Sequence, residues 1–147
     1  MPTSSVKTYR DLIVWQRSME LATAVYDLTL LFPSEELYGL SAEMRKTSCS
    51  IPSRIAAGKA KATKTGYLYY LRAAYILGTE LETHIELSKK LYTTGGLDFS
   101  AVEKPLSEVM KMLFVLIRTL SIKPKKEEDS SETQPSEVVD IRTPVAA

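Results

Sequence analysis

Apolar side chains recur every three or four residues along most of this chain, and residues that break helices interrupt the pattern at three places. Such spacing puts the apolar residues of each stretch on one face of an α-helix. No stretch alternates apolar and polar residues in the manner of a half-buried strand. Four helical stretches with short connectors predict an all-α protein, an antiparallel four-helix bundle with up-down-up-down connections.

Proline and serine mark the expected boundaries of the first two helices. The first helix is expected over residues 9–32, because Pro33 disfavours the helical conformation of the residue before it. Ser34 can cap a second helix, which we expect to kink at Pro52 and to end in a left-handed cap at Gly58. Single residues, rather than the periodicity, thus predict where the second helix begins and ends.

Two further helices follow. We expect the third over residues 66–92, with Gly78 on its inner face to let a neighbouring helix come close. The fourth follows a Gly-Gly pair, and Ser100 and Glu103 have the spacing of a capping box. Beyond it the periodicity vanishes and polar residues dominate. The predicted organisation is a flexible N-terminus (residues 1–8), the bundle (residues 9–122) and a disordered tail (residues 123–147).

The first and third helices carry apolar residues on two sides, whereas a helix in a lone small bundle needs one apolar stripe. On the first helix, Leu12, Trp15 and Met19 belong to the line that we expect to face the core. The additional lines predict contacts between copies of the chain. The residues expected at this oligomer interface are Val14, Leu21 and Leu28 of the first helix and Tyr69, Ile76 and Leu87 of the third.

Charge is distributed unevenly, although the chain as a whole has a formal net charge of +1. Residues 44–79 contain no acidic residue, and such a basic segment attracts phosphate backbones largely regardless of their sequence. Nearby tyrosines at 67, 69 and 70 could stack on bases if they are exposed, or lie in the core. A solvated basic turn is the alternative interpretation. The candidate nucleic-acid-binding residues are Arg45, Lys46, Arg54, Lys59, Lys61, Lys64 and Arg72.

Catalytic and metal-binding patterns are not found. The single histidine, His84, does not follow a glutamate by three residues, as di-iron bundles require, and no Walker-type loop or nucleophile elbow exists. The single cysteine, Cys49, is expected to be a small buried residue. We therefore expect a protein that is not an enzyme and that holds no metal and no cofactor.

Membrane association is not expected, since no apolar run of about 18 residues could span a bilayer. No charged-then-apolar leader reads as a signal peptide, and a lone cysteine suits a reducing compartment. The expected location is the cytoplasm.

Several short motifs occur in an order that resembles a known family. They are Leu12-x-Val14-Trp15-Gln16, Phe32-Pro33, Glu36-Leu37-Tyr38-Gly39-Leu40, Arg45-Lys46, Ser50-Ile51-Pro52-Ser53-x-Ile55-Ala56-x-Gly58 and Glu80-Leu81-Glu82-Thr83. They resemble the four-helix-bundle family that includes proteins encoded in intervening sequences of bacterial large-subunit ribosomal RNA genes. The family prefers asparagine where Arg54 stands and an acid where Ala57 stands, so this chain is more basic near the turn.

This resemblance implies a bundle that assembles as a homopentameric ring. A related branch comprises the accessory variability determinant proteins of diversity-generating retroelements, which bind a reverse transcriptase and its RNA. The resemblance therefore implies a non-enzymatic accessory protein whose partners are further copies of itself, RNA and a reverse transcriptase. The alternative is an intervening-sequence protein that acts as a protein–protein scaffold without binding nucleic acid.

Overall fold

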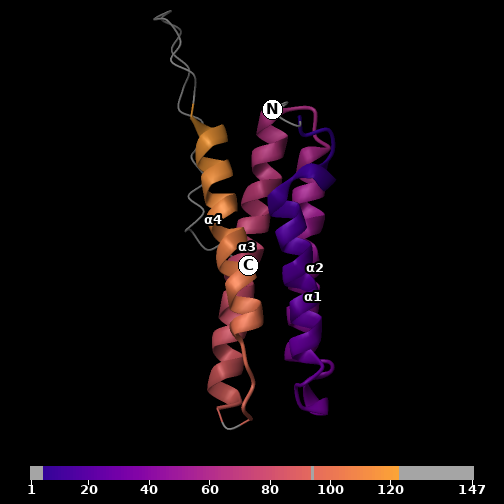
Figure 1. The fold of residues 1–147 in the computed structure, drawn as a ribbon, viewed down its shortest axis with the longest axis vertical. Helices are drawn as coiled ribbons and strands as arrows, with labels where there is room; N and C mark the ends of the chain where they lie inside the picture. The colour runs from indigo at the N-terminus through magenta and orange to yellow at the C-terminus, as the bar shows by residue number, and fades with distance from the viewer. Residues whose placement is uncertain (1–4, 94, 123–147) are drawn as a thin grey trace, which may run out of the picture.

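The computed structural model describes residues 5–93 and 95–122, and within these ranges it contains four α-helices, two short 3₁₀ helices and no strand. The predicted tail and the first four residues lie outside the described residues. The elements, drawn in Figure 1, are η1 (Tyr9–Asp11), α1 (Ile13–Thr29), η2 (Ser34–Glu36), α2 (Leu40–Lys59), α3 (Lys64–Leu91) and α4 (Ser100–Ser121).

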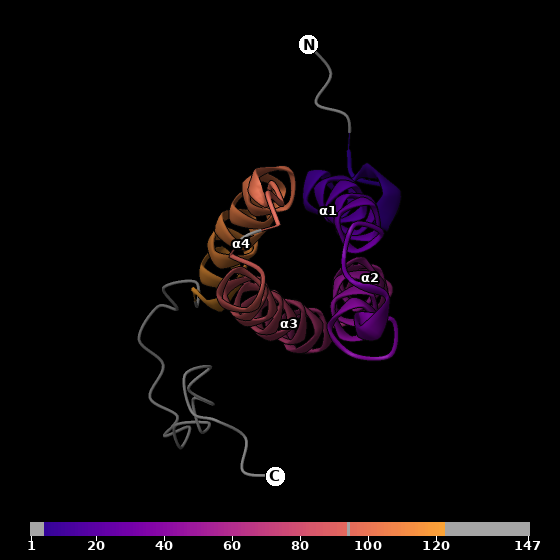
Figure 2. The same ribbon diagram turned by 90° about the horizontal axis from the view of Figure 1, so that it is seen from below.

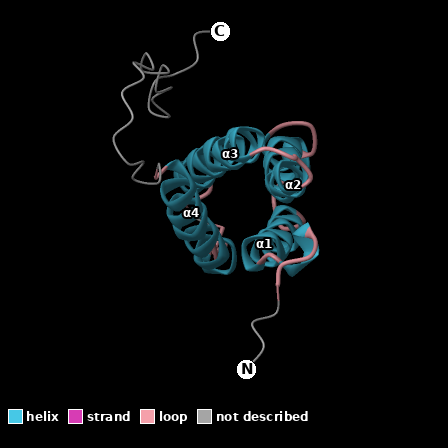
Figure 3. Cartoon of the chain, turned by 90° about the horizontal axis from the view of Figure 1, so that it is seen from above, coloured by secondary structure: helices cyan, strands magenta, loops and turns pink. Residues whose placement is uncertain are grey.

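The four α-helices run alternately up and down, as predicted for a four-helix bundle (Figure 1). Views along the bundle show the order α1, α2, α3, α4 around its axis, so that α4 returns beside α1 (Figures 2 and 3). One end of the bundle holds the α2–α3 connection, the start of α1 and the end of α4. We call it the α2–α3 end, and the other, with the α1–α2 and α3–α4 connections, the opposite end.

The core is formed by the apolar stripes of all four helices. Burial of an aliphatic side chain stabilises a fold by about 1.5–3 kcal/mol, so these stripes supply the main driving force for the packing. The long side chains with no exposed surface are Leu21, Met44, Ile51, Ile55, Leu71, Leu81 and Leu113.

Half of the predicted oligomer interface lies in this core. Val14, Leu21 and Leu28 are 4%, 0% and 5% exposed, so they are not available to a second copy of the chain. Met19, from the line that we expected to face the core, is instead 44% exposed. The prediction for α1 was therefore wrong, because both lines on this helix are apolar and their spacing is the same. The predicted α3 residues, by contrast, are exposed: Tyr69 by 68%, Ile76 by 40% and Leu87 by 44%.

The first helix begins later than predicted because a separate cap precedes it. Thr8 and Asp11 form a capping box around η1, in which the Asp11 carboxylate accepts hydrogen bonds from the backbone of Lys7 and Thr8 at 2.9 and 3.0 Å. These bonds lower the pKa of Asp11. Leu12 then has extended dihedral angles (φ −74°, ψ 121°), and regular helix starts at Ile13.

Gly58 does not end the second helix in a left-handed cap, and α2 continues through Pro52 and Gly58 to Lys59. Among the described glycines, a positive φ (64°) occurs at Gly96. Gly58 is instead a contact point with α3, since a Cβ there would lie 2.7 Å from the Cβ of Tyr70. Glycine at this position lets the two helices approach closely.

Gly78 has the role that was predicted for it, because a Cβ there would collide with the side chain of Met110 from α4. The predicted capping box at Ser100, however, does not form. The residue before it, Phe99, is the N-cap without a side-chain bond, and Asp98 Oδ1 accepts from the Ser100 amide at 2.9 Å. The Glu103 carboxylate pairs with Lys89 of α3 at 2.9 Å, so it is not free to cap its own helix.

A hydrogen bond ties the start of α2 to the end of α3 at the opposite end. The Tyr92 hydroxyl donates to Glu36 Oε1, while Glu36 Oε2 accepts from the Leu40 amide at 2.8 Å and so caps α2. The bond from Tyr92 is the main cause that lowers the pKa of Glu36, and the same bond raises the pKa of Tyr92 to about 12. One carboxylate thereby holds the beginning of one helix and the end of the next.

This bond predicts a specific loss of stability in alkali. A group whose pKa is raised by folding stabilises the native state below its unfolded pKa, and the stabilisation is lost as the pH rises through the folded value. For Tyr92 that window extends from 10.0 to about 12. The free energy of unfolding of the wild type should fall more steeply across this window than that of Tyr92→Phe, as measured by urea denaturation. Tyr38, which is 93% exposed, supplies the control, and Tyr38→Phe should keep the wild-type slope. Equal slopes for the wild type and Tyr92→Phe would contradict the bond.

Candidate nucleic-acid interface at the α2–α3 end

The up-down topology separates charge along the bundle. When each α-helix is divided at its midpoint and each segment between or before the helices is assigned to the nearer end, the half at the α2–α3 end holds ten basic and two acidic side chains among the described residues. The opposite half holds ten acidic and five basic ones. The ten basic residues at the α2–α3 end are Lys7, Arg10, Arg17, Arg54, Lys59, Lys61, Lys64, Arg72, Lys111 and Arg118.

Three lysines surround the α2–α3 connection, where two of them lie over tyrosine rings. Lys59 Nζ is 5.7 Å from the centroid of the Tyr67 ring, and Lys61 Nζ is 5.3 Å from that of Tyr70. The third, Lys64, is exposed at the first position of α3. The face of an aromatic ring attracts a cation, and the side of the cation that points away from the ring stays open to solvent. These contacts hold the positive charges at the surface of the connection.

The tyrosines that carry these lysines are anchored in the bundle. Tyr67 and Tyr70 are half-buried, and burial raises the pKa of Tyr67. They pack against Gly58, while Tyr69 stands outside and meets the ring of Tyr70 edge-on at 5.4 Å. Of the tyrosines considered for base stacking, Tyr69 is thus the one with an exposed ring.

Two of the predicted basic residues do not join this group. Arg45 and Lys46 lie in the first turns of α2, and Arg45 is fourteen residues from Lys59, which is about 21 Å along a helix. The Arg45 Nε donates to Thr29 Oγ1 at 2.8 Å, and its guanidinium lies 5.0 Å from the ring centroid of Tyr26. This arginine therefore joins α2 to α1 within the bundle.

Arg54 and Arg72 lie in the half of the bundle at the α2–α3 end, which we call the basic half, although Arg72 also has a structural contact. Its Nη2 donates to Ser121 Oγ at 3.3 Å and so connects α3 to the end of α4. Arg54 is exposed on the second half of α2. The structure thus brings together five of the seven predicted residues, from Arg54 to Arg72.

The residues missed by sequence reasoning come from α1, the segment before it, and α4. Lys7 and Arg10 precede α1, Arg17 lies on α1, and Lys111 and Arg118 lie on the second half of α4. A search for a continuous basic segment cannot find them, because they are far apart in sequence. Counting charge by half-helices of the predicted up-down bundle would have found them.

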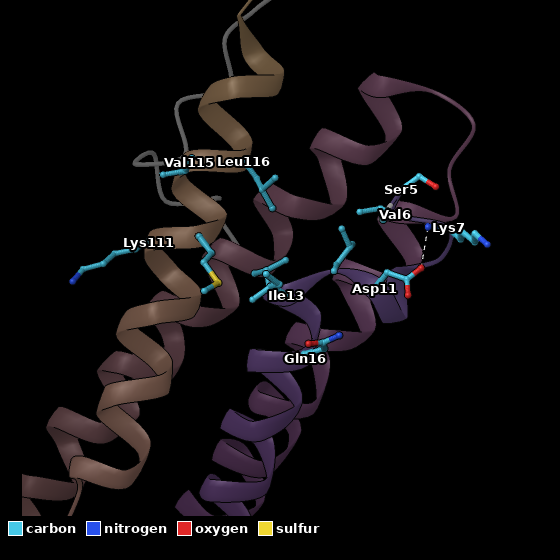
Figure 4. A pocket seen from close by; sticks show the side chains of 12 residues that line it. Ser5, Val6, Lys7, Asp11, Ile13, Gln16, Lys111, Val115 and Leu116 are labelled. Carbon is cyan, nitrogen blue, oxygen red and sulfur yellow. Dashed lines mark hydrogen bonds between the residues drawn. The ribbon is translucent and has the colours of Figure 1, made fainter. Parts of the chain in front are cut away.

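An apolar groove of about 1020 Å³ opens at the same end, between the start of α1 and the second half of α4. It exists because α4 begins beside α1 and ends away from it (Figure 2). Figure 4 shows Ile13 of α1 and Leu116 of α4 projecting between the two helices, whereas Lys111 points away from the gap. Ile13 and Val115 are 61% and 59% exposed. The groove offers apolar surface at the edge of the basic half.

The part of the chain that the structure describes also bears on metal binding, membrane insertion and the environment of its cysteine. No group of three His, Cys, Asp or Glu side chains there could hold a metal ion, and none of its helices is both long and apolar enough to cross a membrane. Cys49 is exposed, not buried as expected, and its Sγ lies 3.8 Å from the Tyr26 hydroxyl. The expectation failed because Cys49 lies on the outer face of α2, beside the ring of Tyr26.

Comparison with known proteins supports the motif resemblance. No curated protein matches the chain in sequence. The family model described as 23S rRNA-intervening sequence protein matches residues 10–115, which include α1, α2, α3 and most of α4. With this match extending over well more than half of its length, the chain belongs to the family of 23S rRNA-intervening sequence proteins.

Proposed function

We propose that the protein is a non-enzymatic accessory protein that binds RNA through the α2–α3 end of its bundle. The observation that carries the proposal is the excess of basic side chains there, ten against two acidic ones. Lysines and arginines that neutralise phosphates release condensed counterions, and this term supplies most of the affinity in sequence-independent binding. The role of these residues is phosphate contact, not catalysis.

The proposal includes assembly into a homo-oligomer, with five copies in a ring as the preferred form. Its support is the outward face of α3, where Tyr69, Ile76 and Leu87 leave apolar surface uncovered. The family resemblance points to the same assembly. A ring would multiply the positive charge of one α2–α3 end by the number of subunits, which strengthens attraction to RNA.

A reverse transcriptase of a diversity-generating retroelement is the proposed protein partner. This part of the proposal rests on the resemblance to the accessory proteins of those elements and on the added basic character near the α2–α3 connection. The partner would be recognised together with its RNA, since both would meet the same charged end.

The apolar groove favours a second candidate function, a protein–protein scaffold. Its uncovered Ile13 and Val115 would suit an apolar segment of another protein better than a phosphate backbone. Under this alternative the basic connection is a solvated surface, and RNA binding is absent.

Charge reversal separates the two candidates. The triple variant Lys59→Glu, Lys61→Glu, Lys64→Glu should lose at least about tenfold in affinity for a structured RNA at 50 mM salt. Loss of three phosphate contacts should also flatten the slope of log affinity against log salt by about 2 to 3. Fluorescence anisotropy gives both quantities, and light scattering of the same samples gives the number of chains per particle.

The matched control reverses three lysines of the opposite half, Lys46, Lys90 and Lys104, and changes the net charge by the same amount. It should cost less than about threefold in affinity, because these residues lie away from the proposed phosphate contacts. Equal losses in both variants would show that net charge alone attracts the RNA. Absence of binding by the wild type would move the function to the scaffold.

A further inference from the structure

The chain leaves the described bundle beside its basic residues. Ser121, the last residue of α4, accepts the hydrogen bond from Arg72, and Ile122 follows it. Along α3, Lys64 lies eight residues before Arg72, a distance of about 12 Å on a helix. The remaining 25 residues of the chain therefore start next to the proposed phosphate contacts.

Beyond Ile122 the sequence first contains three lysines, at positions 123, 125 and 126, and then becomes acidic. Residues 127–140, which we call the acidic segment, contain six acidic residues and no basic one. The acidic segment begins five residues after Ile122, and five residues span at most about 17 Å. Its first carboxylates can therefore reach the lysines of the α2–α3 connection. The six residues are Glu127, Glu128, Asp129, Glu132, Glu137 and Asp140.

We infer that the acidic segment binds the α2–α3 end of its own chain and competes there with RNA. The competition, though not the contact itself, rests on the proposed function. A carboxylate, like a phosphate, offers several acceptor oxygens to lysine and arginine donors. Exposed ion pairs are individually weak, but a short tether gives the segment an effective concentration in the millimolar range. A nucleic acid therefore displaces the acidic segment only when it presents many phosphates at once.

The charge complementarity is local. In the half of the bundle that the acidic segment can reach first, Asp11 and Glu20 are the described acids, and both lie on or before α1. The Asp11 carboxylate is occupied by the backbone of Lys7 and Thr8, and that of Glu20 by Arg17 at 3.0 Å. Neither carboxylate pairs with a lysine that surrounds the α2–α3 connection, so these lysines are available to the acidic segment.

The first test measures RNA affinity in the full chain. Neutralising the nearest acids, by Glu127→Gln, Glu128→Gln and Asp129→Asn, should tighten binding of a structured RNA about fivefold at 50 mM salt. The gain should vanish at 0.5 M salt, where both contacts are screened. The control neutralises three exposed acids of the opposite half, Asp27→Asn, Glu43→Gln and Glu80→Gln, and should change affinity less than about twofold.

The second test needs no RNA. A carbodiimide joins a lysine amine and a carboxylate that are in contact, so the wild type should yield cross-links between Lys59, Lys61 or Lys64 and Glu127, Glu128 or Asp129. Mixing unlabelled and ¹⁵N-labelled protein distinguishes links within one chain from links between copies. Mass spectrometry should find links within one chain, and 0.5 M salt should suppress them.

The outcomes separate the two proposals. Links within one chain without RNA binding by any variant would support the contact and remove the proposed function. RNA binding that is unchanged in the acid-neutral variant, together with absent links, would overturn the inference and leave the proposed function standing. Links found between copies alone would also overturn it, since the segment would then belong to a neighbour.

Discussion

Replacing Leu21 with glutamate is expected to unfold the bundle. Leu21 has no exposed surface and lies in the core among the other helices. A carboxylate there would have to be buried without a partner or protonated, which costs several kcal/mol, in addition to the lost apolar contacts. Since a small domain is stable by only about 5–15 kcal/mol, a loss of about 4 kcal/mol or more is severe. Circular dichroism during urea denaturation should show a much lower midpoint or no folded baseline.

The same change on α3 should have a different effect. Ile76 is 40% exposed, so Ile76→Glu leaves its charge in water and should retain the helical signal and most of the stability. If the outward face of α3 joins copies of the chain, the folded Ile76→Glu variant should also show a lower particle mass in light scattering. A Leu21→Glu protein that folds stably and merely dissociates would contradict the burial of Leu21 and restore it to an interface.

Replacing Gly58 with leucine is expected to force α2 and α3 apart. The added Cβ would lie 2.7 Å from Tyr70 Cβ, an atom fixed to the backbone that cannot rotate away. It would also meet Tyr67 Cδ2 at 3.2 Å and the Tyr67 carbonyl oxygen at 3.3 Å. Overpacking of this kind costs about 1–3 kcal/mol, and a side chain as long as leucine should reach the upper value despite its better helix propensity.

Urea denaturation of Gly58→Leu measures this cost, and Gly95→Leu supplies the control. A Cβ at Gly95 would find its nearest neighbour, Leu97 Cγ, at an ordinary 3.9 Å, so this variant should stay within about 0.5 kcal/mol of the wild type. Equal stability of the two variants would contradict the prediction, because it would mean that α2 and the Tyr67–Tyr70 turn can move apart without a loss in the free energy of unfolding.

The number of helices and their up-down order could be predicted from the sequence, because periodicity and chain breakers act locally. The inner face of α1 could not. Its two apolar lines have the same spacing, and only the positions of α2 and α4 decide that Val14 and Leu21 are covered while Met19 is 44% exposed. Which line a helix buries is a property of its neighbours.

Gly58 shows a second limit, since glycine serves both left-handed caps and close helix contacts. The choice between these roles depends on Tyr70, twelve residues further along the chain. The candidate site was predicted in part for a related reason. A continuous basic segment identified Lys59, Lys61 and Lys64, but the cations of α1 and α4 join them only through the fold.

The lengthwise separation of charge has a consequence for assembly. In any closed ring built by rotation about one axis, all subunits point the same way. Bundles of this protein that stood upright in such a ring would place their cationic ends on one rim and their anionic ends on the other, giving a two-faced particle. Neighbouring subunits would then repel each other along both rims, and added salt would weaken this repulsion. In such a ring, added salt should therefore promote closure while it weakens the proposed binding of RNA to the cationic rim.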